Sequence, residues 1–306
     1  MLLKQTVEVL DLLDSSTANG EEIKELLLSR GLKNVKTKTV EGKTGSTDFI
    51  KAVIPGTNGK LSGGKAPTLG IVGRLGGLGA RPTQIGFVSD GDGAAAVLAA
   101  ALKFGDMLTR GDVLEGDTII ATHICPNAPI NYPMMGSPVD MTVMNETEID
   151  PQMDAILSVD TTKGNRIYNH RGFTITPTIK EGWILRPSDD LIDIMYRVTG
   201  EIGSIFAVTT QDITPYGNGV SHINSILQPS CVTNVPLVGV PIVAHSIPIG
   251  CSTGSSHEID IALTATFCIE VAKDYGRGKC SFYKEDEWDI LMKKYGPLHH
   301  LQTQGK

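Results

Sequence analysis

The first third of the chain alternates between helical and extended patterns of apolar residues. Apolar side chains at positions 2, 3, 7, 10 and 13 recur at helical spacing and predict an amphipathic helix over 2–14. Asn19 followed by Glu22 is typical of a capping box and predicts a second helix that ends at Gly31. Two runs rich in Val, Thr and Ile then predict an antiparallel pair of strands over 34–40 and 48–54.

From residue 67 the pattern changes to short, almost wholly apolar runs, several of them followed by helical segments. Such runs are typical of strands that helices bury on both faces. We expect strands over 69–73, 85–88, 118–122, 155–159, 205–209 and 236–244, and helices over 93–108, 188–199, 258–275 and 284–295. The sequence therefore predicts an α/β three-layer sandwich with a mixed, largely parallel central sheet flanked by helices. We expect one domain over 1–306, with residues 1–66 packed on it as a helical and β-hairpin portion.

Composition narrows the classes of partner. The chain has 34 acidic and 27 Lys or Arg residues and a net charge of -7, which does not suit a nucleic-acid backbone as partner. Five cysteines without a C-x-x-C pair favour free thiols in a reducing compartment. The N-terminal segment has no continuous apolar core, and no window reaches the length of a membrane span. We expect a cytoplasmic protein that binds no membrane and no nucleotide cofactor.

Polar side chains follow several of the predicted strands. In open α/β sheets the ligand site lies outside the carboxyl ends of the strands, so these side chains are candidates for chemistry. They are Asp90, Asp92, His123, Cys125, Asp160, Asp212 and His245, with His257 and Glu258 at the start of the following predicted helix. Histidines and carboxylates that converge on one edge indicate a metal or acid–base site.

Each candidate also has a simpler explanation. Asp90 or Asp92 suits the cap of the helix that begins at residue 93, and a single histidine at a strand end is more often a hydrogen-bonded core residue. Arg74 suits a carboxylate clamp or a solvent-exposed loop position. The stretch Gly59–Lys65 has the spacing of a phosphate-binding loop, but Ala66 stands where a hydroxyl is required, so we reject that interpretation.

Several stretches carry a family resemblance. PTLGIVGRLGGLGARPTQIGFVSDGDGAAAVLAAALK, ATHICPNAP, MGSPVDM, ILSVDTTKGNRIYNHRGF, TTQDITPYGNGV and GSSHEIDI resemble the bacterial family designated domain of unknown function 1177. The order of elements is more distantly similar to that of co-catalytic zinc aminopeptidases and carboxypeptidase-like metallohydrolases. That second resemblance implies a bridging carboxylate at Asp90 or Asp92, a terminal carboxylate ligand at Asp160 and a late histidine ligand at His257.

The chain departs from those metallohydrolases at two points. Their first histidine ligand would fall at Gly73-Arg74-Leu75-Gly76, and their Glu-Glu pair would fall at His123-Ile124-Cys125. We therefore expect a single divalent metal, zinc by the resemblance, held by His123, Asp160, His257 and Asp90 or Asp92. Arg74 would bind a substrate carboxylate, and Glu258 or Glu181 would act as base.

Three functions remain open at this point. The first is a metal-dependent hydrolase of amide or short peptide-like substrates. The second is a catalytically inactive small-molecule-binding protein on the same scaffold, and the third is a metal-free isomerase or racemase that uses Cys125 and Cys251 as acid and base. The long, weakly charged segment 223–256 and the stretch around Met134 and Met135 also lead us to expect a homo-oligomer.

Overall fold

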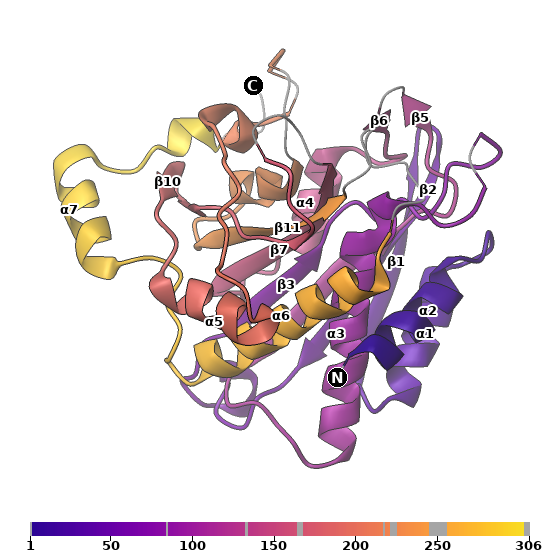
Figure 1. Ribbon diagram of the computed structural model, residues 1–306, viewed down its shortest axis with the longest axis horizontal. Helices are drawn as coiled ribbons and strands as arrows, with labels where there is room; N and C mark the ends of the chain where they lie inside the picture. Colours follow the sequence, from indigo (N-terminus) through magenta and orange to yellow (C-terminus); the bar gives the residue numbers. More distant parts are fainter. Residues whose placement is uncertain are drawn as a thin grey trace.

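A mixed β-sheet forms the centre of the molecule (Figure 1). The computed structural model describes residues 2–83, 85–131, 134–163, 168–216, 218–220, 225–244 and 256–302. Within these residues the sheet has nine strands in the order β1-β2-β4-β3-β7-β11-β9-β10, with β8 paired to β11. The four central strands β4, β3, β7 and β11 are parallel, and antiparallel strands complete the sheet on both sides.

The strands of this sheet are short at one side and long at the other. Their bounds are β1 Asn34–Gly42, β2 Gly45–Ile54, β3 Leu69–Gly73, β4 Thr118–Ile124, β7 Ala155–Lys163, β8 Gly172–Phe173, β9 Thr178–Lys180, β10 Trp183–Leu185 and β11 Leu237–Ala244. A separate two-stranded ribbon pairs β5 Ile130–Asn131 with β6 Met134–Met135.

Helices cover both faces of the sheet, so the predicted three-layer α/β architecture is confirmed. The α-helices are α1 Leu3–Leu13, α2 Gly20–Ser29, α3 Asp92–Thr109, α4 Met141–Glu148, α5 Asp189–Thr199, α6 Glu258–Gly276 and α7 Glu285–Tyr295. Short 3-10 helices are η1 Lys60–Ser62, η2 Ser89–Gly91, η3 Thr210–Ile213, η4 Ser225–Cys231 and η5 His299–Leu301. No helix among the described residues is long and apolar enough to cross a membrane.

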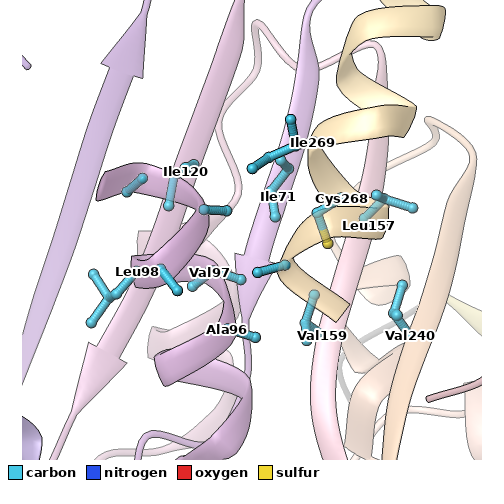
Figure 2. Packing of buried hydrophobic residues seen from close by; sticks show 14 of the residues in the cluster. Ile71, Ala96, Val97, Leu98, Ile120, Leu157, Val159, Val240, Cys268 and Ile269 are labelled. Carbon is cyan, nitrogen blue, oxygen red and sulfur yellow. The ribbon is translucent and has the colours of Figure 1, made fainter. Parts of the chain in front are cut away.

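The sheet has a hydrophobic core on each face, because successive side chains of a strand point to opposite faces. Ile120, Ile71, Leu157 and Val238 lie side by side on neighbouring strands and belong to the larger core, which α3 and α6 cover. Figure 2 shows Ala96, Val97 and Leu98 of α3 and Cys268 and Ile269 of α6 in this layer. Residues one position earlier, such as Ile119, Ile156 and Leu237, belong to a second core with η3 and η4 on the other face.

Helix α3 is buried almost all round because a second layer of helices covers it. Alanines at 94–96 and 99–101 have relative exposures of 0%. Their small side chains let α3 lie against the sheet on one side and against α1 and α6 on the other. The helices α1 and α2 contribute Val9, Leu13, Ile23 and Leu27 to the same core.

Two of the predicted strands are wrong. Residues 85–88 form a loop in which Ile85 is 90% exposed and Gly86 has a positive φ, and Val88 donates its N–H to the carbonyl of Leu78. Residues 205–209 contribute only the isolated bridge between Ile205 and Ile175. Both runs are apolar but have no strand beside them along their length. The sequence analysis also missed α4 and the short strands β5, β6, β8, β9 and β10.

Candidate functional site

The carboxyl ends of β3 and β7 meet at the point where the chain reverses the direction in which it adds strands. After β3 the chain passes through α3 to β4 on one side, and β7 then returns to the other side of β3. Arg74 directly follows β3. Its backbone N–H donates to the carbonyl oxygen of Val159 at 2.6 Å, and Val159 immediately precedes Asp160 in β7. In sheets of this kind ligands bind at such a switch point. The candidate site therefore centres on Arg74 and Asp160.

Close backbone packing holds the start of α3 against this edge. A Cβ added to Gly93 would lie 2.6 Å from the carbonyl oxygen of Arg74 and 2.7 Å from that of Val159. The hydroxyl of Thr161 also donates to the carbonyl of Ser89 in η2. Asp90 and Asp92 lie between these two contacts, at the same edge of the sheet as Asp160.

Arg74 is a buried cation with a buried partner. Its side chain has 0% exposure, and its Nη1 donates to Glu148 Oε2 at 2.5 Å, while Nη2 contacts Met141 Sδ. Burial opposes ionisation of Glu148, but the charge of Arg74 and the hydrogen bonds from His123 and Arg74 outweigh it and lower the pKa of this carboxyl. Glu148 is therefore a carboxylate that balances the guanidinium.

His123 belongs to the same network and not to the carboxylates at the start of α3. Its Nδ1 is hydrogen-bonded to Glu148 Oε1, and its Nε2 accepts the backbone N–H of Gly76 at 3.2 Å. Because Nε2 accepts, Nδ1 carries the proton and donates to Glu148. Both ring nitrogens are thus occupied by protein partners, and the structure does not present His123 as the metal ligand that the sequence predicts.

Two buried carboxyl groups at this edge have a pKa well above that of an ordinary aspartate. Burial raises the pKa of Asp160 to about 7, although it accepts from Ser225 Oγ at 2.8 Å and from the N–H of Thr161 at 2.7 Å. Burial raises the pKa of Asp92 to about 8, although Ser256 Oγ donates to it at 2.5 Å. Both groups can therefore exchange a proton near neutral pH.

His257 and Glu258 stand at the start of α6 beside Asp92. His257 is the residue that precedes the helix, and its neighbour Ser256 holds Asp92. Glu258 is exposed, and its charge, like that of Asp260, raises the pKa of Asp92. The structure thus brings His257 and Glu258 toward Asp92, but Glu258 lies outside the network of Arg74. Glu181, the other candidate base, is in a turn with positive φ, forms an ion pair with Lys180 and lies 3.6 Å from His299 Nε2.

The described residues do not fit the metal that the resemblance implies. No group of three or more His, Cys, Asp or Glu side chains among them could hold a metal ion. Arg74 places a positive charge where a first histidine ligand would stand, and its charge acts on Asp160. His123 is committed to Glu148 and Gly76. The metal role of Asp90, Asp92, Asp160 and His257 stays a prediction.

Cys125 lies in a small apolar cluster with Ala80, Val88 and Ala128. Burial raises the pKa of its thiol, which makes the thiolate scarce at neutral pH. Cys251, its partner in the isomerase hypothesis, and His245 lie outside the described residues. Nothing within the described part of the chain gives Cys125 the electropositive surroundings of a reactive thiol.

Sequence reasoning missed the residues that complete the network. Glu148 and Asn145 lie on α4, which has only a weak apolar periodicity, although Asp140 caps it by accepting the N–H of Thr142 at 2.8 Å. Tyr216 is half-buried near both Arg74 and Asp160, and its partial burial raises its pKa to about 12. The capping residue Asp140 is the sequence feature that could have indicated α4. Nothing in the local sequence indicates that α4 packs against Arg74.

The raised pKa of Asp92 gives a testable pH dependence. An acid whose pKa is higher in the folded than in the unfolded state binds a proton on folding, so the free energy of unfolding falls as pH rises from about 4 to about 8. Asp92→Asn cannot ionise and should be more stable than the wild type at pH 8.5, by about 1–2 kcal/mol, with no such gain at pH 4.5. Urea denaturation at both pH values measures this. A variant that is less stable at pH 8.5, together with a chelator-sensitive wild type, would instead indicate a cation at Asp92.

Comparison with known proteins places this geometry in a structural context. A glutaminyl cyclase from an Acidobacteriales bacterium superposes with a TM-score of 0.53 at 12% identity, covering 90% of this chain and 94% of that one. The LapA aminopeptidase of Legionella pneumophila gives a TM-score of 0.46 at 11% identity, covering 92% and 71%. At these identities the likeness to the cyclase concerns the fold alone. No curated protein matches the chain.

The sequence itself identifies the family. The model described as protein of unknown function, DUF1177, matches residues 38–305, which include Arg74, His123, Glu148, Asp160 and the start of α6. The chain belongs to this family.

Proposed function

We propose that the protein binds a small molecule bearing an amide or a carboxylate at the Arg74 site and does so without a metal ion. The observation that carries this proposal is a guanidinium with 0% exposure whose Nε–H has no hydrogen-bond partner among the described residues. An unpaired donor on a buried cation is costly, so a site that retains one needs a reason such as a ligand. Asp160, with a pKa of about 7, stands beside it as a group that can give or take a proton.

The chemistry of the donor set supports a guanidinium-based site. Arg74 offers donors in a fixed planar arrangement, which suits carbonyl and carboxylate oxygens. Glu148 holds this plane from one side, and His123 in turn is hydrogen-bonded to Glu148. These residues would bind and orient a carbonyl-bearing ligand, and Asp160 would hold a proton next to it. The fold shared with a glutaminyl cyclase supplies the scaffold and does not identify the ligand.

Conservative replacement of the arginine tests this function. Arg74→Lys keeps the charge opposite Glu148 but loses the Nε–H and the planar fork. We expect small amides or carboxylates to raise the melting temperature of the wild type and to bind Arg74→Lys at least about 10-fold more weakly, which corresponds to one lost hydrogen bond to a charged group. Arg186→Lys is the matched control, because the Arg186 side chain is 60% exposed and, within the described part of the chain, its ion pair is with Asp189. Calorimetric titration measures both affinities.

Two results would contradict the proposal. The first is a panel of small amides and carboxylates that neither stabilises nor binds the wild type. The second is binding that EDTA abolishes and added zinc restores, together with hydrolysis of the amides, which would favour the metal-dependent hydrolase that the sequence resemblance implies. Metal analysis of protein purified without chelator accompanies both measurements.

A further inference from the structure

A cavity of about 390 Å³ lies between the loop that leads into β8, the end of α5 and the first turns of α6. Helices α5 and α6 pack against each other (Figure 1). The side chains around the cavity that concern a ligand belong to Arg171, Phe173, Glu201, Ile259, Asp260 and Leu263. The volume is within the range of about 300–1,000 Å³ that is typical of small-molecule pockets. Neither Arg74 nor Asp160 lines this cavity, so it is a candidate site of its own.

Asp260 is the buried polar residue of the cavity. It lies in the first turn of α6, and 5% of its surface is exposed. Its Oδ2 atom has no hydrogen-bond partner among the described residues. Arg171 Nε lies 3.9 Å from this oxygen, which is too far for a hydrogen bond. A buried carboxylate oxygen without a donor is costly, so this atom calls for a donor from a bound group.

The other charged side chains of the cavity are exposed. The Arg171 side chain is 62% exposed. Glu201 is exposed too, and the hydrogen bonds that join it to Thr199 run through its backbone. Two carboxylates therefore share the cavity with one guanidinium. This excess of negative charge favours a ligand with a cationic group, while Arg171 offers a place for an anionic group.

Apolar side chains form the rest of the wall. Phe173 is 3% exposed, and its ring packs on that of Phe267 with 5.2 Å between the centroids, which fixes its position. Leu263 follows Ile259 by four residues on α6, so the two share a face of the helix. Ile259 is 58% exposed although it is a large apolar residue. An apolar group of a ligand would remove part of this surface from water.

The charged groups together narrow the class of ligand. A simple amine would satisfy Asp260 but would bring its charge close to the Arg171 guanidinium. A simple carboxylate would satisfy Arg171 but would face Asp260 and Glu201. A molecule with an ammonium and a carboxylate group side by side avoids both conflicts, because each charge then lies next to its opposite. An α-amino acid carries these two groups on one carbon atom.

We propose that this cavity binds an α-amino acid with an apolar side chain. Its ammonium group donates to Asp260, its carboxylate accepts from Arg171, and its side chain packs on Phe173 and Leu263. This inference does not depend on the function proposed for Arg74.

Calorimetric titration of the full chain with leucine and two analogues tests this inference. Isoamylamine lacks the carboxylate of leucine, and isocaproate lacks its ammonium group. We expect leucine to bind at least about 10-fold more tightly than either analogue, because each analogue loses a hydrogen bond to a charged group.

Substitutions assign the two ends of the ligand. Asp260→Asn should weaken the binding of leucine at least about 10-fold. Arg171→Gln should weaken leucine by a similar factor and should not weaken isoamylamine. The matched controls are Asp286→Asn, at an exposed aspartate in the first turn of α7, and Arg186→Gln, at an exposed arginine. Neither control should change the affinity for leucine.

Three results would overturn the inference. The first is that leucine does not bind the wild type. The second is that leucine binds but neither Asp260→Asn nor Arg171→Gln weakens it. The third is that Arg74→Lys abolishes the binding while Asp260→Asn leaves it unchanged. Leucine would then occupy the Arg74 site through its carboxylate, which supports the proposed function and refutes this inference. Because Arg171 is exposed, Arg171→Gln keeps the test decisive if Asp260→Asn does not fold.

Discussion

Arg74→Met should lower the free energy of unfolding by about 3–5 kcal/mol. The substitution removes the cation opposite Glu148, whose side chain is 1% exposed, and leaves a carboxylate buried without a counter-charge. His123 donates to the other oxygen of the same carboxylate but does not replace the lost charge. Urea denaturation at pH 7 measures the effect.

A double-mutant cycle separates the ion pair from simple packing. Arg74→Met with Glu148→Gln should be less destabilised than the sum of the two single variants, because the double variant leaves no unpaired buried charge. Arg186→Met, at an exposed ion pair, should change stability by no more than about 0.5 kcal/mol. Additive single effects, or a stable Arg74→Met variant, would mean that Arg74 and Glu148 do not form the buried pair described here.

Gly93→Ala should destabilise the protein by about 3 kcal/mol or more, at the upper end of overpacking effects. The new methyl group would meet the carbonyl oxygens of Arg74 and Val159 within 2.7 Å, and both of these are backbone atoms that cannot turn aside. The start of α3, including Asp92, would have to move away from the end of β7. Thermal and urea denaturation measure the cost.

Gly111→Ala provides the comparison for this second substitution. Gly111 has a φ of +85° but nothing within 4 Å of an added Cβ, so its substitution costs backbone strain only, about 1 kcal/mol. The two variants therefore separate strain from a steric clash. Equal losses of stability in both would contradict the close contact between α3 and the ends of β3 and β7.

The architecture could be predicted because its signals are local. Continuous apolar runs mark β3, β4, β7 and β11, and the alanine-rich segment marks α3, so the parallel centre of the sheet follows from the sequence. The same reasoning fails for residues 85–88 and 205–209. These runs have the composition of strands, but the chain provides no neighbour for them to pair with, and pairing is decided by contacts far away in sequence.

The candidate site was predicted only in part for a related reason. The rule that ligands bind at strand ends points to Asp90, Asp92 and Asp160, which lie at one edge of the sheet, and their role there stays a prediction. The partners of His123 and Arg74 do not follow from that rule. Both side chains are held by Glu148, which is 74 residues from Arg74 and lies on a helix with little apolar periodicity. The sequence shows which residue types are present but not that a carboxylate from α4 neutralises the arginine.

Helices α1 and α2, which form the second layer over α3, lie outside the segment that the family model matches. The family match begins at residue 38, inside β1, and so leaves out α1, α2 and the first residues of the edge strand. Those helices bury Val9, Leu13, Ile23 and Leu27 in the same core as the alanines of α3. A shorter chain that starts at residue 38 would expose this apolar surface to water and would tend to aggregate. The segment that the family model matches is thus smaller than the segment whose side chains build this core.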